Sequence, residues 1–190
     1  MTVHQTHFME KQDLIRRLVD EKLIHGLGVS MVNATDDFIT TVQKYSNAVI
    51  HVINGVLTED SVSKMADKNL KMLILGYKHL RRGNDFYSKA EPKILSNQEW
   101  LYNNLPEIVK KFRVVSFDNL GIEQLNVRRL MSEEKWNEFY MGDEGSATFY
   151  IDMVNRKFAE SSTAPLDERF DLLGSVDEMF QVIKGNVRVG

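Results

Sequence analysis

The sequence predicts an α/β protein with a parallel sheet and a β-hairpin appended near its C-terminal end. Four short apolar runs, rich in β-branched residues, alternate with amphipathic stretches; they cover residues 26–33, 48–54, 71–77 and 113–117. This alternation is typical of βαβ units, in which a helix returns the chain to the start of the next parallel strand. Two later runs, residues 147–154 and 157–161, flank Asn155-Arg156 and predict the hairpin.

Helices are expected around the apolar runs, from the amphipathic spacing of residues 9–24 and elsewhere mainly from capping residues such as Thr58 and Ser96. The expected helices cover residues 9–24, 36–45, about 58–68, 96–112, 123–140 and 176–184. Pro106 predicts a kink in the fourth of them, and Ser132 a second start in the fifth. Residues 78–95 read as a long polar loop, and the residues before 9 as a frayed terminus.

Length and composition limit the classes of protein. The chain has 190 residues, which suits one domain with a small appendage, here divided as residues 1–145 and 146–190. Its net charge of −3 makes nucleic acid an improbable partner. It contains no cysteine, which excludes disulfides, zinc–thiolate sites, thiol nucleophiles and cysteine-ligated clusters within this chain. It shows neither a signal-peptide pattern nor a membrane-spanning run, so we expect no membrane association and a cytoplasmic location.

Polar residues follow each of the four predicted strands, at the edge where parallel α/β proteins place their chemistry. They are Ser30 and Asn33, His51 and Asn54, Tyr77 and Lys78, and Asp118 and Asn119, with Glu123 and Gln124 close behind. Turn formation and helix capping are the competing explanation at each single position. For His51, a satisfied core histidine is favoured over a ligand. We expect no metal site and assign no catalytic residue.

Several segments together resemble a family of radical S-adenosylmethionine (radical SAM) proteins common in bacteriophages. They are Gly26-Leu27-Gly28-Val29-Ser30, His51-Val52-Ile53-Asn54-Gly55, Leu73-Ile74-Leu75-Gly76-Tyr77-Lys78 with Arg82-Gly83, Ser116-Phe117-Asp118-Asn119-Leu120-Gly121-Ile122-Glu123-Gln124-Leu125 and Glu138-Phe139-Tyr140-Met141-Gly142-Asp143. The resemblance covers about residues 9–184. It implies that the sheet is a partial parallel (β/α) barrel, formed by the later strands of the family's barrel.

The resemblance also implies positions for a cofactor. Ser30 and Asn33 match the strand end that contacts the ribose of S-adenosylmethionine. Ile53 and Gly55 match a Gly-x-Ile-x-Gly-like motif that packs on adenine, although His51 replaces its first glycine. The backbone at Leu75 and Gly76 matches another adenine contact. The candidate cofactor-binding residues are therefore Ser30, Asn33, Ile53, Asn54, Gly55, Gly76, Lys78, Asp118 and Asn119.

The main departure from the family is the missing CxxxCxxC loop, whose thiolates hold a [4Fe–4S] cluster. Without it this chain cannot cleave S-adenosylmethionine reductively by itself, and no cofactor of its own is expected. We expect a cluster-less, phage-related protein that acts by binding a partner protein, as an accessory or inhibitory factor. The alternative is the C-terminal half of a split radical SAM enzyme, completed by a chain that carries CxxxCxxC. An ordinary enzyme using Asp118 or Glu123 as a base has less support.

The predicted sheet also suggests association. Residues 26–33 are expected to form an exposed edge strand, which favours a homodimer or a complex with another protein. Asp118 and Asn119 are expected to end a central strand and to lie at the same rim as Asn54 and Lys78.

Overall fold

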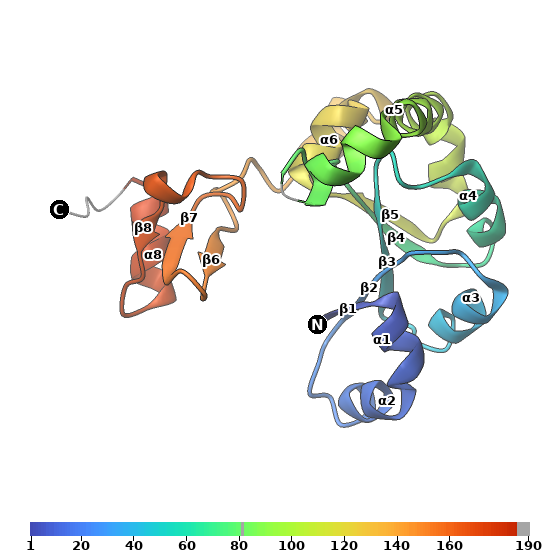
Figure 1. The fold of residues 1–190 in the computed structure, drawn as a ribbon, viewed down its shortest axis with the longest axis horizontal. Helices are drawn as coiled ribbons and strands as arrows, with labels where there is room; N and C mark the ends of the chain where they lie inside the picture. The colour runs from blue at the N-terminus through green and yellow to red at the C-terminus, as the bar shows by residue number, and fades with distance from the viewer. Residues whose placement is uncertain (81, 186–190) are drawn as a thin grey trace. The chain divides into compact units, whose positions relative to one another are not determined.

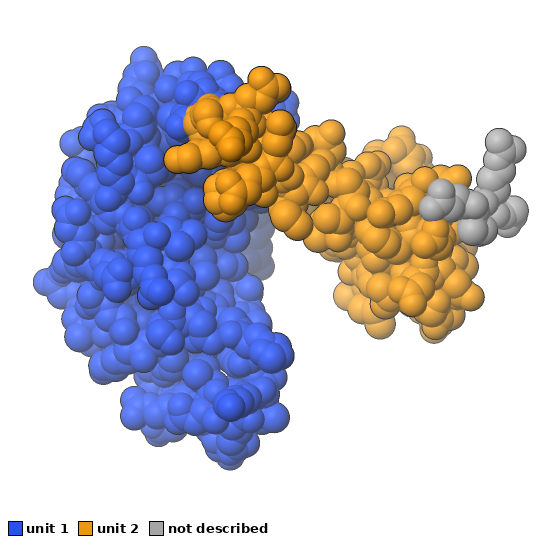
Figure 2. Space-filling model, turned by 180° about the vertical axis from the view of Figure 1, so that it is seen from behind, with its two compact units in different colours: residues 1–130 blue, residues 131–190 orange. Residues whose placement is uncertain are grey.

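The computed structural model describes residues 1–80 and 82–185, and it divides into two compact units. Unit 1 comprises residues 1–130 and unit 2 residues 131–190 (Figure 2). The sequence places the domain boundary at residue 145 instead. The difference is the segment with helix α7 (Glu133–Phe139), which the structure groups with the second unit.

Unit 1 is built on a five-stranded sheet in which every neighbouring pair is parallel. The strands are β1 (Thr2–His4), β2 (Leu27–Ser30), β3 (Ala48–Ile53), β4 (Lys71–Leu75) and β5 (Val114–Phe117). Their order in the sheet is their order in the chain. The predicted α/β class, the parallel sheet and all four predicted strands are therefore confirmed.

Helices connect successive strands of unit 1, and one more helix follows β5. They are α1 (Gln5–Glu10), α2 (Gln12–Asp20), α3 (Asp36–Val42), α4 (Glu59–Met65), α5 (Arg82–Ile108) and α6 (Asn119–Leu125), with 3₁₀ turns at Val109–Lys111 and Val127–Leu130. Side chains of Thr35, Thr58 and Asp118 cap α3, α4 and α6 by accepting backbone N–H bonds. In Figure 1, α1 to α4 lie on one side of the sheet.

The two faces of the sheet differ in burial because strand side chains alternate. The face toward the helices carries fully buried residues such as Val29, Ile50 and Ile74. The opposite face, called the inner face below, is only partly buried. Its residues are Ser30 on β2, Val49, His51 and Ile53 on β3, Lys71, Leu73 and Leu75 on β4, and Val114 and Ser116 on β5. The helices therefore bury one face only.

The N-terminal residues correct two expectations. Residues 2–4 are not frayed but form β1, which pairs with β2 in register Val3 to Val29. The Met1 ammonium group donates to the Gly26 carbonyl at 2.9 Å and anchors this strand. Residues 26–33 therefore do not form the edge, and the prediction that they would is wrong. At the opposite side of the sheet, β5 is an edge strand and not a central one.

The loop predicted over residues 78–95 is wrong, and the helix predicted over residues 123–140 is confirmed only in part. Residues 78–95 are not a long loop, because α5 begins at Arg82. Its irregular residue is Ala90 (φ −135°, ψ 16°), two residues before Pro92, and Pro106 is accommodated within the helix. The expected helix over 123–140 is also interrupted, because Asn126 adopts a left-handed conformation and ends α6. Ser132 starts α7 as predicted.

Unit 2 contains a three-stranded antiparallel sheet of β6 (Tyr150–Asp152), β7 (Lys157–Ala159) and β8 (Phe170–Asp171). A 3₁₀ turn, Leu166–Glu168, precedes β8, and α8 (Val176–Ile183) follows it. The predicted hairpin and final helix are confirmed, whereas the two-residue β8 has no sequence signal. The core consists of Phe158 with Met179 and Val182.

A buried ion pair also holds unit 2 together. Arg169 Nη1 donates to Asp152 Oδ2 at 2.9 Å, and each side chain is 7% exposed. Asp152 also accepts bonds from the backbone of Val154 and from the backbone and side chain of Asn155. The hydrogen bonds from Asn155, followed by the one from Val154 and the charge of Arg169, lower the pKa of Asp152, although burial opposes them.

Across residues 1–80 and 82–185, no helix has the length and apolar character that crossing a membrane requires.

Candidate functional site

The carboxyl ends of β3, β4 and β5 meet at one rim of unit 1. Asn54, directly after β3, donates from Nδ2 to Oε1 of Gln124 on α6 at 3.0 Å. Gly76, directly after β4, donates its N–H to Oδ1 of Asp118 at 2.8 Å. The prediction that Asn54 and Asp118 lie at the same rim is therefore confirmed.

Gln124 on α6 connects the ends of β3 and β4 at this rim through its side-chain hydrogen bonds. Its Oε1 also accepts the N–H of Tyr77 at 2.8 Å, and its Nε2 donates to the Tyr77 carbonyl at 2.9 Å. Because of these two bonds, it is the Oε1 acceptor of Gln124 that faces Asn54. The Asn54 amide must therefore turn its Nδ2 donor toward Gln124 and its Oδ1 away from it. Oδ1 of the buried Asn54 then has no hydrogen-bond partner within the described part of the chain.

Asp118 has a structural role at this rim. Its Oδ1 accepts the N–H of Gly121 at 2.7 Å as well as that of Gly76, so the carboxylate caps α6 and holds the end of β4. A Cβ at Gly76 would lie 2.4 Å from Leu120 Cγ, so only glycine allows this approach of α6 to β4. With two N–H bonds on one oxygen, Asp118 is placed as a cap rather than as a general base. Glu123 is exposed and lines none of the cavities described below.

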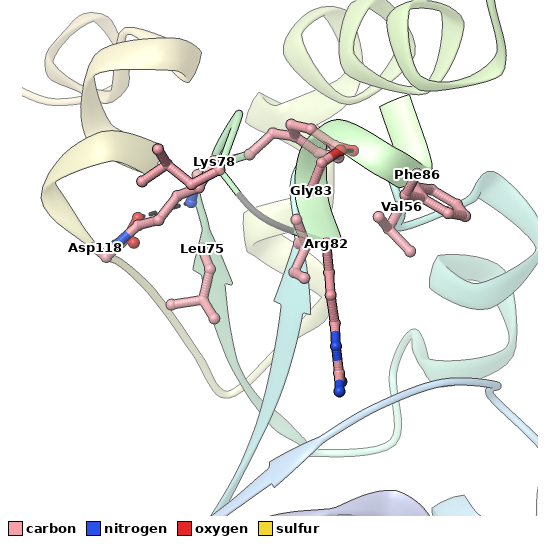
Figure 3. Close-up of a pocket in the computed structure, with 11 residues that line it drawn as sticks. Val56, Leu75, Lys78, Arg82, Gly83, Phe86 and Asp118 are labelled. Carbon is pink, nitrogen blue, oxygen red and sulfur yellow. Dashed lines mark hydrogen bonds between the residues drawn. The ribbon is translucent and has the colours of Figure 1, made fainter. Parts of the chain in front are cut away.

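A cavity of about 540 Å³ opens at the same rim (Figure 3). It is lined by Ile53, Val56, Leu75, Gly76, Tyr77, Lys78, Leu80, Arg82, Gly83, Phe86 and Asp118. Four of the candidate cofactor-binding residues, Ile53, Gly76, Lys78 and Asp118, are among them. Sequence reasoning missed Val56, Leu80 and Phe86 because they lie after the strand ends, among residues expected to form loops.

A second cavity of about 330 Å³ adjoins the first and shares Val56 and Phe86 with it. It lies over the loops that follow β2 and β3 and contains two further candidates, Asn33 and Gly55. Its lining is more polar and includes the lysines Lys64 and Lys93.

The remaining candidates lie outside both cavities. Asn54 is buried beneath the rim, at 2% exposure. Ser30 is on the inner face, opposite His51 in the strand register. Asn119 is the first residue of α6. The structure therefore divides the nine candidate residues among several places and does not bring them into one cavity.

Tyr77 is a rim residue whose role becomes visible only in the structure. Its hydroxyl donates to the Gly83 carbonyl at 2.8 Å, and its ring contacts those of His79 and Tyr87. Burial raises the pKa of Tyr77, so the phenol remains protonated near neutral pH and holds the start of α5 against the rim.

His51 lies half-buried on the inner face, and its ring occupies the space left by Gly28. A Cβ on Gly28 would lie 2.5 Å from His51 Cε1. Burial, followed by the nearby Met1 ammonium group, lowers the pKa of His51. Within the described ranges, no three His, Cys, Asp or Glu side chains form a group that could hold a metal ion.

We expect His51 to titrate at lower pH in the folded chain than in the chain unfolded by urea, where its pKa should be about 6.5. Folding favours the neutral ring of His51. The contribution of His51 to the free energy of unfolding is therefore complete above the unfolded-state pKa, and it is lost as the pH falls through the lower, folded-state pKa. Two-dimensional NMR of carbon-labelled histidine over a pH series measures both values. A folded-state pKa at or above the unfolded value would contradict the burial seen here.

Comparison with known proteins finds no protein-family model, curated protein or solved structure that matches this chain.

Proposed function

We propose that this chain acts by binding a partner protein on the inner face of its parallel sheet, in an accessory or inhibitory role. The observation that supports this is the coverage of the sheet on one face only. Parallel sheets occur almost only with both faces covered, because the crossover helices lie on both faces, and their strands are accordingly apolar on both sides. The inner face carries Ile53 and Val114, which are 41% and 46% exposed, with Leu73 and Leu75 between them.

The strand order supports a finer proposal for the fold. Strands that follow one another in sheet and chain alike, joined by helices, are arranged as in a (β/α) barrel. We propose that unit 1 is a partial barrel and that its inner face is the barrel interior. The expected occupant is an apolar segment of a different protein, with an acidic group placed to meet Lys71. In line with the resemblance to phage radical SAM proteins, we propose that the chain is phage-related and acts in the host cytoplasm.

The 540 Å³ cavity favours a second candidate function. It gathers Ile53, Leu75 and Gly76, which the resemblance assigns to adenine contacts, and the strand-end candidates Lys78 and Asp118. In that case this chain is the C-terminal half of a split radical SAM enzyme. A companion chain with CxxxCxxC would supply the cluster, and this chain would supply part of the pocket.

Site-specific photo-crosslinking tests the partner proposal. A benzophenone amino acid replaces Leu73 on the inner face, and in a matched control it replaces Thr40, which is exposed on α3. In cells of the source organism, position 73 should crosslink to one other protein and position 40 should not. Leu73→Glu should prevent co-purification of that protein while circular dichroism still shows the native melting curve. Crosslinks from position 73 to residues 131–185 of the same chain, or to a second copy, would contradict the proposal.

The purified complex then distinguishes the two candidate functions. Iron and acid-labile sulfide in the complex, together with S-adenosylmethionine binding in equilibrium dialysis, would identify a split enzyme. A complex with neither would support an accessory or inhibitory protein.

A further inference from the structure

Four large apolar side chains around the 540 Å³ cavity are unusually accessible to solvent. They are Ile53, Val56, Leu80 and Phe86, between 39% and 48% exposed. They come from the end of β3, the following loop, the loop after β4, and α5. Exposed apolar groups that converge on one cavity are typical of ligand sites, and small-molecule pockets commonly measure about 300–1,000 Å³.

The charges around this cavity favour an anion. Lys78 and Arg82 line it with a single acidic residue, Asp118, whose Oδ1 already accepts two backbone N–H bonds. Among the described residues no carboxylate lies within ion-pair distance of Arg82, which is exposed. In the view of Figure 3, Arg82 and Asp118 lie on opposite sides of Leu75. The acidic side of the cavity is therefore already hydrogen-bonded, whereas the Arg82 guanidinium has no carboxylate beside it in the described part of the chain.

We propose that this cavity binds a small apolar anion, namely a ring or compact hydrocarbon that carries one carboxylate or phosphate group. The apolar body packs on Phe86, Val56 and Leu80. The anionic group pairs with the Arg82 guanidinium, whose planar fork suits two oxygens of one group. This site needs no partner protein, although it shares Ile53 and Leu75 with the inner face and lies in the cavity considered above for S-adenosylmethionine.

Three probes with the same ring test the charge selection. They are 2-naphthoate, the neutral 2-naphthalenemethanol and the cationic 2-naphthylmethylammonium, titrated into the nitrogen-labelled full chain and followed by amide chemical shifts. We expect 2-naphthoate to bind saturably and to shift amides of residues 75–80 and 86. The alcohol should bind at least about tenfold more weakly, because a hydrogen-bonded charge pair commonly contributes a factor of this size. The ammonium probe should bind more weakly still.

Matched variants locate the anion. Arg82→Ala should weaken 2-naphthoate binding to the level of the alcohol, and Arg82→Lys should retain part of it. Lys89→Ala removes an exposed cation from the same helix outside both cavities and should change nothing. Lys93→Ala tests the adjoining cavity; if it, and not Arg82→Ala, weakens binding, the assignment to Arg82 is overturned.

Filling the cavity tests its apolar part. Ile53→Trp places a larger side chain at the exposed end of β3 and should abolish binding of 2-naphthoate and the alcohol together. Leu80→Trp, in the loop after β4, repeats the test should the first variant lose its native melting curve. Equal binding of all three probes, or no saturable shift at residues 75–80, would overturn the proposal.

Discussion

Replacing Gln124 with leucine is expected to lower the free energy of unfolding of unit 1 by about 2–4 kcal/mol, since each buried polar group left without a partner costs about 1–3 kcal/mol. The side chain accepts from Asn54 and from the Tyr77 N–H, and it donates to the Tyr77 carbonyl. Leucine has a similar size but satisfies none of these groups. The rim that joins β3, β4 and α6 should loosen as a consequence.

Urea unfolding followed by tryptophan fluorescence measures this change. The chain has two tryptophans, Trp100 in unit 1 and Trp136 in unit 2, so a Trp136→Phe background reports on unit 1 alone. Glu123→Gln, one residue away and exposed, is the control and should change stability by less than about 0.5 kcal/mol. A Gln124→Leu variant as stable as this control would show that the hydrogen bonds at the rim contribute little.

Replacing Arg169 with methionine should selectively unfold unit 2. The substitution leaves the Asp152 carboxylate inside the unit without its cation, and breaking a buried pair from one side is far more damaging than removing both partners. Amide signals of residues 150–183 should collapse toward random-coil positions while those of unit 1 remain. The double variant Asp152→Asn with Arg169→Met should recover part of the native spectrum. A single variant with a native unit 2 spectrum would show that Asn155 alone holds Asp152.

The lowered pKa of Asp152 also determines how the stability of unit 2 should depend on pH. Because its pKa is lowered on folding, Asp152 stabilises unit 2 above about pH 4, the usual value for an unfolded aspartate. This stabilisation is lost as the pH falls through the lower, folded-state pKa. Thermal melts between pH 2 and 7 should show the loss in the native chain and a weaker dependence in Asp152→Asn. Identical pH profiles for the two proteins would assign the acid response to other groups.

Local signals in the sequence predicted much of the fold. The apolar β-branched runs identified β2 to β5, because the face toward the helices is largely buried and needs apolar residues, and much of the inner face is apolar as well. Asn155-Arg156 identified the hairpin of unit 2. Strand β1 was missed because it has only three residues, one of them the exposed His4, which is too few to show the alternation of a strand. It forms a strand by pairing with β2, a contact that the local sequence does not reveal. Similarly, α5 was missed over residues 82–95 because it buries only Ile94 there.

The candidate site was harder to predict, for a physical reason. The sequence indicated which residues end the strands, but the direction of each side chain depends on strand register and on α6. Asp118 and Asn119 are adjacent in the chain, yet Asp118 lines the cavity and Asn119 does not. The apolar wall formed by Val56, Leu80 and Phe86 depends on loops whose course no periodic pattern encodes. Gln124 appeared only as a polar residue near Asp118, and its three contacts become apparent in the folded chain.

The order of the strands in unit 1 has a consequence for how the chain folds. Since each strand pairs with the one made just before it, the sheet can grow one strand at a time as the chain emerges during synthesis. The bond between Asn54 and Gln124 spans 70 residues and forms only after α6 exists. Until then β3 and β4 are paired through their backbones, but the side-chain hydrogen bonds of Asp118 and Gln124 at their carboxyl ends are missing. We therefore expect the cavity to be the last part of unit 1 to take shape, and ligand binding there to report that the whole unit has been completed.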